Sequence, residues 1–242
     1  MARTLPENDF RRVRNCLIGD AYRTPGRQLD RNVWDNLVNL NDTVLIETTD
    51  TYPNIVESAH SIGWSWLDIF DTCPKDSPIS SQIFAALECF EGSRFNAYCG
   101  WYRIAGIVLR CGLEDVLLGL YFQLHPDRQP TFSKIIAGEE LSPKLGVILR
   151  ELAGVSAAAA DLCNEAKDLY HKELSVYVHR VSHGTIWEST GPVFVPDALE
   201  TWFDQYLRTY RLLCHFVDVV VPGARASEIA GRVCAEVSEP LA

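Results

Sequence analysis

The sequence has no uninterrupted apolar run of the roughly 18 residues that a membrane-spanning helix needs. Arg103, Arg110 and Glu114 interrupt the longest candidate, so we expect no membrane span. Basic residues are in the minority, because 22 Lys and Arg stand against 32 Asp and Glu, a formal net charge of −10. A domain that holds nucleic acid mainly through its phosphates is usually basic. The charge therefore argues against a general polyanion binder.

Close pairs of cysteines are missing as well. None of the eight cysteines belongs to a Cys-x-x-Cys pair, the kind of pair that a structural zinc site needs. Most of them lie in apolar helical segments, where a reduced cysteine behaves as a small buried side chain. No secretory signal peptide is recognisable, so the pattern predicts a protein of the reducing cytoplasm.

Glycine and proline are too scarce, at 15 and 12 residues, for a collagen-like or disordered chain, and 47% of the residues are apolar. Charge is unevenly distributed: seven Arg against four acidic residues give residues 1–31 a balance of +3, which leaves −13 for the rest. The acidic residues and the scarcity of Ser in this segment argue against an organellar transit peptide. We predict an Arg-rich helix and loop over 1–30 and a single helical-bundle domain over 31–242.

Helical periodicity runs through nearly the whole sequence. Apolar residues recur at three- and four-residue steps, and Pro, Gly and Ser mark the breaks. The run Thr43–Ile46 would also fit a strand. We predict an all-α protein, a single antiparallel bundle of about seven or eight helices. The expected helices cover 31–48, 53–73, 80–91, 94–124, 142–153, 155–183 and 196–221, followed by a short C-terminal helix, with connections at 126–142 and 184–196.

The helix expected over 94–124 places charged residues on an otherwise apolar segment. Arg103 and Arg110 are seven residues apart, and Glu114 follows Arg110 by four, so the three share one stripe. Charges on an interior helix are costly unless they are paired. This pattern favours a structural ion pair that fixes the register of the bundle. The alternative is an Arg that Glu114 holds and aims at a phosphate or carboxylate.

The helix expected over 155–183 carries a second polar stripe. His171, Ser175, His179 and His183 recur every four residues on one face. Two His at this spacing can bind a metal, but the glutamate of the HExxH motif is missing and Arg180 would repel a cation. Ser175 and His179 could form a nucleophile and its base, although the sequence shows no orienting acid. The pattern alone favours a His and Ser seam hydrogen-bonded to a neighbouring helix, and no cofactor or metal is expected.

A third candidate lies on the helix expected over 196–221. Arg208 and His215 are seven positions apart and therefore fall on one face. There His215 could transfer a proton, and Arg208 could stabilise the charge that develops on a phosphate.

The two polar helices together resemble a group of uncharacterised bacterial all-helical proteins whose signature stretches are LRxxLE and YxxLSxYVH. The matching residues are Leu109, Arg110, Leu113 and Glu114, and then Tyr170, Leu174, Ser175, Tyr177, Val178 and His179. The Gly that usually follows this His is displaced to Gly184. The resemblance covers about residues 94–190. More distantly, such proteins are similar to the HEPN superfamily.

The HEPN resemblance implies a helical bundle that often acts as a metal-independent ribonuclease in toxin and phage-defence systems. The HEPN motif is an Arg followed after four to six residues by His, commonly completed across a dimer, and Arg208 to His215 fits this spacing. The implied chemistry is attack of an RNA 2′-hydroxyl on the adjacent phosphate, with His179 or His215 moving the proton and Arg110 or Arg208 neutralising charge.

Two hypotheses from different classes follow. The first is a cytoplasmic HEPN-like ribonuclease or effector that meets RNA only at a local groove, as a homodimer or with a partner protein. The second is a non-catalytic helical interaction or scaffold subunit, similar to an antitoxin, whose polar seams fix its packing. A metal-dependent hydrolase that uses His171, His179 and His183 ranks third.

Overall fold

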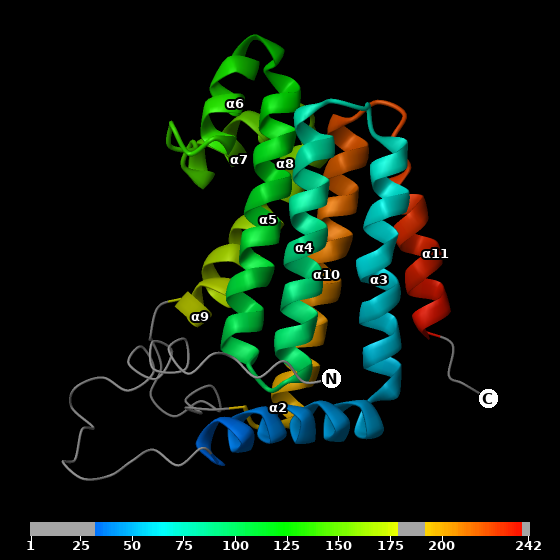
Figure 1. Cartoon of the computed structure of the whole chain (residues 1–242). Helices are drawn as coiled ribbons and strands as arrows, with labels where there is room; N and C mark the ends of the chain where they lie inside the picture. Colours follow the sequence, from blue (N-terminus) through cyan, green and yellow to red (C-terminus); the bar gives the residue numbers. More distant parts are fainter. Residues whose placement is uncertain (1–31, 179–191, 239–242) are drawn as a thin grey trace, which may run out of the picture. The chain divides into compact units, whose positions relative to one another are not determined.

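The computed structural model describes residues 32–178 and 192–238 (Figure 1). The chain divides into two units, Met1–Asn39 and Leu40–Ala242. The Arg-rich segment expected over 1–30 lies outside the described residues. All regular structure in the described ranges is helical, which confirms the all-α class. None of the helices within the described ranges is long and apolar enough to cross a membrane.

The helices mostly begin near the predicted positions, and the run Thr43–Ile46 is helical. Pro occupies the first turn of α3, α4 and α10, where its missing N–H costs nothing. The elements are α2 (Asn32–Thr51), α3 (Pro53–Thr72), α4 (Pro78–Tyr98), α5 (Tyr102–Leu124), η2 (Pro126–Arg128), α6 (Gln129–Ile136), α7 (Leu145–Ala153), α8 (Ala157–Asp168), the π-helical turn η3 (Leu169–Leu174), α9 (Ser175–Val178), α10 (Pro196–Val220) and α11 (Ala226–Ser238).

The boundary between α4 and α5 differs from the prediction. A break was expected near Gly92, but α4 continues to Tyr98. Ser93 is helical and buried. Its hydroxyl is satisfied there, because it donates to Ala105 O at 2.8 Å and accepts from Trp202 Nε1 at 3.0 Å. The chain turns instead at Gly100, whose φ of +77° suits glycine and whose Cα packs closely on the backbone of Val193.

The bundle is only partly antiparallel. Helices α3, α4 and α5 alternate in direction, but α10 runs in the same direction as α3 (Figure 1). Tyr206 OH donates to Ala59 O at 3.2 Å, and Tyr210 OH lies 2.6 Å from Ser65 Oγ, so residue numbers rise together along both helices. The long connection between α5 and α10 returns the chain to the end where α5 begins, and this crossover explains the parallel pair.

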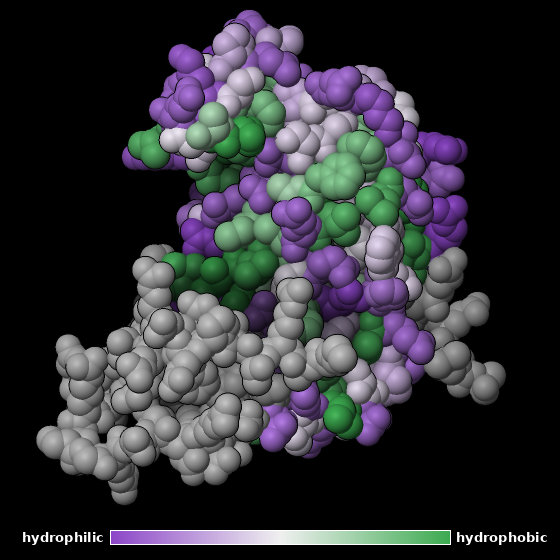
Figure 2. Space-filling view, in the orientation of Figure 1, coloured by the Kyte–Doolittle hydropathy of each residue, from purple (hydrophilic) through white to green (hydrophobic). Residues whose placement is uncertain are grey.

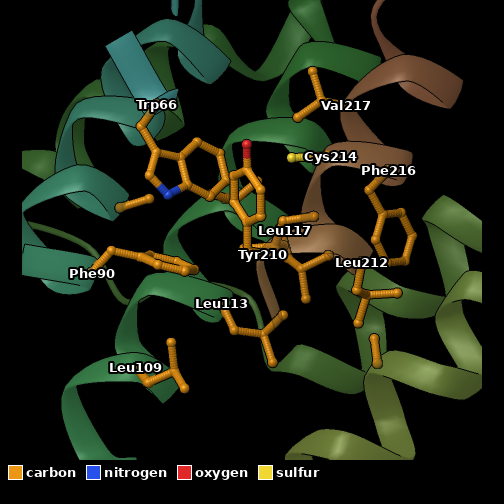
Figure 3. Packing of buried hydrophobic residues seen from close by; sticks show 14 of the residues in the cluster. Trp66, Phe90, Leu109, Leu113, Leu117, Tyr210, Leu212, Cys214, Phe216 and Val217 are labelled. Atoms are coloured by element: carbon orange, nitrogen blue, oxygen red, sulfur yellow. The ribbon is translucent and has the colours of Figure 1, made fainter. Parts of the chain in front are cut away.

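The core lies between α3, α4, α5 and α10. Trp66, Phe90 and Tyr210 meet there, with the Trp66 ring centroid 5.2 Å from that of Phe90 and 5.6 Å from that of Tyr210 (Figure 3). Leucines spaced four residues apart on α5 extend this cluster: Leu109, Leu113 and Leu117. Most of the described cysteines are buried, as expected: Cys73, Cys99, Cys163, Cys214 and Cys234.

Two segments differ from the prediction, one because it is more helical and one because it is divided. The connection expected at 126–142 contains η2 and the eight-residue helix α6. The single helix expected over 155–183 is divided into α8, η3 and α9, and its predicted end lies beyond the described residues. The π-helical turn η3 interrupts the regular four-residue periodicity on which that prediction depended.

Candidate functional site

Arg110 of α5 is the centre of the first candidate site, and 17% of its side chain is exposed. Its Nε donates to Glu114 Oε1 at 3.1 Å. Nη2 donates to the hydroxyl of Tyr170, and Nη1 lies 3.5 Å from Ser175 Oγ. The guanidinium also stacks over the Tyr170 ring, 4.1 Å from its centroid. The two helices singled out in the sequence therefore meet at Arg110.

The partner segment of Arg110 is the π-helical turn η3. The backbone N–H of Ser175 bonds to the carbonyl of Tyr170, and the Ser175 hydroxyl donates to the same oxygen at 2.6 Å. This five-residue step brings Tyr170 and Ser175 to one side of the turn, where both face Arg110. It also separates Ser175, which is half-buried, from His171, which is exposed.

A close approach at Gly106 holds α9 against α5. A Cβ at Gly106 would overlap the ring of Tyr177. The Tyr177 hydroxyl donates to Gln205 Oε1 of α10 at 2.6 Å, and its carbonyl accepts from Arg103 Nε at 2.8 Å. Gly106 thus gives the Tyr177 ring the space that lets α9 pack against α5.

The Arg110 cluster uses its polar groups within the chain. Each of the three guanidinium nitrogens faces a side chain of the protein, and the Ser175 hydroxyl proton is donated to the backbone. Burial and the neighbouring Glu114 raise the pKa of Tyr170, so the phenol stays protonated near neutral pH. This geometry favours the structural ion pair over an Arg aimed at a ligand.

The histidine stripe is described only in part. His179 and His183 lie outside the described residues, and so does the metal site that would combine them with His171. Among residues 32–178 and 192–238, no group of three or more His, Cys, Asp or Glu side chains could hold a metal ion. His171 packs the edge of its ring against Tyr170, with the ring centroids 5.0 Å apart.

Arg208 and His215 have separate partners. Arg208 Nη1 forms bonds of 2.9 and 2.8 Å to the two carboxylate oxygens of Glu173 on η3, and 37% of its side chain is exposed. His215 turns to α11, where its Nδ1 lies 2.9 Å from Ser227 Oγ. The shared helical face predicted from their spacing does not bring the two groups to one ligand.

His215 lies at an open cavity between α10 and α11, with a volume of about 400 Å³. Arg211, Ser227, Gly231 and Cys234 also line it. Arg211 Nε donates to Cys234 Sγ at 3.4 Å, and Ser227 lies in the first turn of α11. The cavity therefore combines a proton-transfer group with a guanidinium, which is the pairing that phosphodiester chemistry needs.

Sequence reasoning missed Arg211 and Ser227. Arg211 precedes His215 by four residues, so the same-face rule would have found it. The spacing of the HEPN motif points to Arg208 instead, because only three residues separate Arg211 from His215. Ser227 belongs to another helix, and no spacing rule connects it to His215.

Comparison with known proteins gives no family for the chain. No family model matches it, and no curated protein or solved structure matches it either. The resemblance to HEPN proteins, and the activity which that resemblance implies, therefore stay predictions.

Proposed function

We propose that the chain is a metal-independent endoribonuclease whose reactive groups are His215 and Arg211. The observation that carries the proposal is that both side chains line the open cavity between α10 and α11. Ser227 occupies Nδ1 of the exposed His215, so Nε2 is the nitrogen left for a substrate. Among the described contacts, Arg211 bonds to Cys234 through Nε, and we assign its terminal nitrogens to a phosphate.

The proposed reaction is a transesterification within RNA. His215 Nε2 accepts the proton of a ribose 2′-hydroxyl while the 2′-oxygen attacks the adjacent phosphorus. The O2′–P bond forms, the P–O5′ bond breaks, and a water molecule gives a proton to the leaving 5′-oxygen. The resulting hydroxide takes the proton from Nε2 of the His215 imidazolium, which returns the ring to its neutral form. Arg211 contacts the non-bridging oxygens on which negative charge develops. The products are a 2′,3′-cyclic phosphate and a 5′-hydroxyl.

Arg211 brings a positive charge to the cavity itself, in a chain whose net charge is −10. An RNA strand would meet this cation in a small groove, with few phosphate contacts.

The HEPN resemblance is the basis for proposing a role in a bacterial toxin or phage-defence module, although the proposed pair departs from its motif: three residues separate Arg211 from His215, where the motif has four to six. It also supports a homodimer, or a complex with a partner protein, as the acting form. The proposed biological role and the proposed oligomeric form rest on the family resemblance, whereas the proposed reactive groups rest on the cavity.

Incubating the purified protein with single-stranded RNA in the presence of a chelator tests the proposal. We expect cleavage that leaves 2′,3′-cyclic phosphate ends, and a loss of at least about 100-fold in His215→Ala, the usual contribution of a general base. Arg211→Ala should lose a similar factor, because one preorganised charge contributes about as much.

Two further histidines serve as controls. His171→Ala changes an exposed ring at η3 and should leave the rate unchanged. A loss in His179→Ala with none in His215→Ala would move the activity to the other helix and reject this site. A folded wild-type protein without cleavage would reject the ribonuclease.

A second candidate function, that of an interaction subunit, rests on a different observation. Figure 2 shows exposed apolar side chains on the face of the molecule that lies over α4 and α5. Phe95, near the end of α4, is 62% exposed, and Ile104, near the start of α5, is 43% exposed. The two helices approach closely beside them, where Gly92 packs on Val108. Surfaces of this kind often bind other proteins, and here we propose a second copy of the chain.

Sedimentation measurements test this second candidate. Wild type should dimerise in the micromolar range, and Phe95→Glu should shift it to monomer by placing a charge in the apolar contact. Leu141→Glu is the matched control. Leu141 is 92% exposed and belongs to neither α4 nor α5, so this substitution should not change the oligomeric state. A monomeric wild type at high concentration would reject self-association.

A further inference from the structure

The junction between α10 and α11 is fixed by a side chain of α10. Asp218 accepts two backbone hydrogen bonds from the first residues of α11, from Ala226 N to Oδ1 at 2.6 Å and from Ser227 N to Oδ2 at 2.9 Å. A carboxylate at this place satisfies N–H groups that a helix start leaves without partners. The start of α11 is therefore held in place on α10.

The side chain of Ser227 contacts α10 a second time, at His215. Its hydroxyl lies 2.9 Å from Nδ1 of His215, and His215 precedes Asp218 by three residues on the same helix. Asp218, the backbone of Ser227, its hydroxyl and His215 thus form a closed ring across the two helices. Because the backbone of Ser227 is clamped, the position of its hydroxyl relative to the imidazole does not depend on a long, flexible side chain.

A neutral imidazole has one nitrogen that donates and one that accepts. The Ser227 hydroxyl can donate to Nδ1 or accept from it, and only as an acceptor does it leave Nε2 as the base that the proposed reaction requires. We infer that Ser227 is a positioning residue that accepts the Nδ1–H of His215 and leaves Nε2 unprotonated toward the cavity. Nε2 is then the base that receives the 2′-hydroxyl proton. Ser227 itself touches no substrate in this account.

The other groups around the ring leave this nitrogen available. On α10, Arg211 bonds to Cys234, and Asp218 is used by the backbone of α11. On α11, Glu228 is exposed and lies 3.9 Å from Arg225. Ser227 is thus the partner that the described contacts give to His215.

The tautomer of His215 can be measured by ¹⁵N NMR of the imidazole, without any substrate. Wild type should show a protonated Nδ1 and an unprotonated Nε2 once the ring is neutral. Ser227→Ala should change this to a mixture of the two tautomers, and Ser227→Thr, which keeps a hydroxyl, should restore the wild-type state. A wild-type ring protonated at Nε2, or a tautomer that Ser227→Ala leaves unchanged, would overturn the inference.

Activity gives the second readout, and this part rests on the proposed ribonuclease. Loss of one such hydrogen bond corresponds to a decrease of roughly 5- to 10-fold in cleavage rate for Ser227→Ala, with recovery in Ser227→Thr. If His215→Ala cleaves as well as wild type but the tautomer responds to Ser227, the ribonuclease fails and the positioning role stands. If cleavage needs His215 but the tautomer ignores Ser227, the positioning role alone fails.

Discussion

The surroundings of Arg110 and those of His215 contain similar side chains, and they differ in what remains available to a ligand. Around Arg110, the guanidinium meets Glu114, Tyr170 and Ser175 and ties α5 to the turn η3. Around His215, the cavity between α10 and α11 stays open. Polar residues on an apolar helix thus serve packing in one region and line an open cavity in the other, and their internal partners distinguish the two.

Gly106→Ala, at the contact between α5 and α9 near Arg110, is expected to lower the stability of the fold most. Alanine favours a helix over glycine by up to about 1 kcal/mol, so an unhindered site would gain stability. At Gly106 the new methyl group would overlap the Tyr177 ring, and we expect a net loss of about 3 kcal/mol in urea unfolding. Gly146→Ala is the control, since a Cβ there meets nothing within 4 Å and should not destabilise. Equal results for both variants would contradict the close packing of α9.

Removing the charge at Arg110 should have the next largest effect. Arg110→Met keeps most of the side-chain volume but loses the bonds to Glu114 and Tyr170, and we expect a loss of about 2 kcal/mol in the free energy of unfolding. The matched variant Glu114→Gln should cost less, because 43% of the Glu114 side chain is exposed. An Arg110→Met protein as stable as wild type would contradict a structural role for the Arg110 contacts between α5 and η3.

The ion pair between Arg208 and Glu173 is more exposed than Arg110 and should stabilise the fold less. Arg208 binds Glu173 through two short bonds, but 37% of its side chain is exposed, so water screens the pair. Arg208→Gln should cost about 0.5 kcal/mol and leave RNA cleavage unchanged. A large loss of cleavage in this variant, without unfolding, would restore Arg208 to the reactive site.

The smallest effect is expected at Asp115, next to Glu114 on α5. Burial raises the pKa of this carboxyl, and the Cys89 thiol beside it donates a hydrogen bond of 3.6 Å. The folded state therefore binds the proton more tightly than the unfolded state, and stability decreases as pH rises from the unfolded pKa of about 4 through the raised folded pKa. Asp115→Asn should be slightly more stable than wild type at pH 7, and this advantage should vanish below pH 4. If the stability gain of Asp115→Asn over wild type grew as the pH fell, the raised pKa of Asp115 would be contradicted.

Most helices could be predicted because their apolar faces and Pro starts are local signals. The division between α4 and α5 could not, because Gly92 and Ser93 are typical of a break and only tertiary packing makes them helical. Ser93 is stabilised inside α4 by bonds to Ala105 and Trp202, and both residues are distant in sequence. The direction of α10 likewise depends on the long crossover before it.

The candidate site was predictable to a similar extent. The pairing of Arg110 with Glu114 follows from a four-residue step. The approach of Tyr170 and Ser175 to Arg110 depends on a π-helical turn, for which the sequence shows no regular period. The cavity at His215 depends on α11, whose Ser227 no spacing on α10 could indicate.

The rate of RNA cleavage in chelator by His215→Ala and Arg110→Met, at a temperature where both variants are folded, tests the contrast between the two regions. We expect a loss of at least about 100-fold for His215→Ala and a change of less than about twofold for Arg110→Met. Cleavage that survives the loss of His215 and disappears with Arg110 would contradict this contrast.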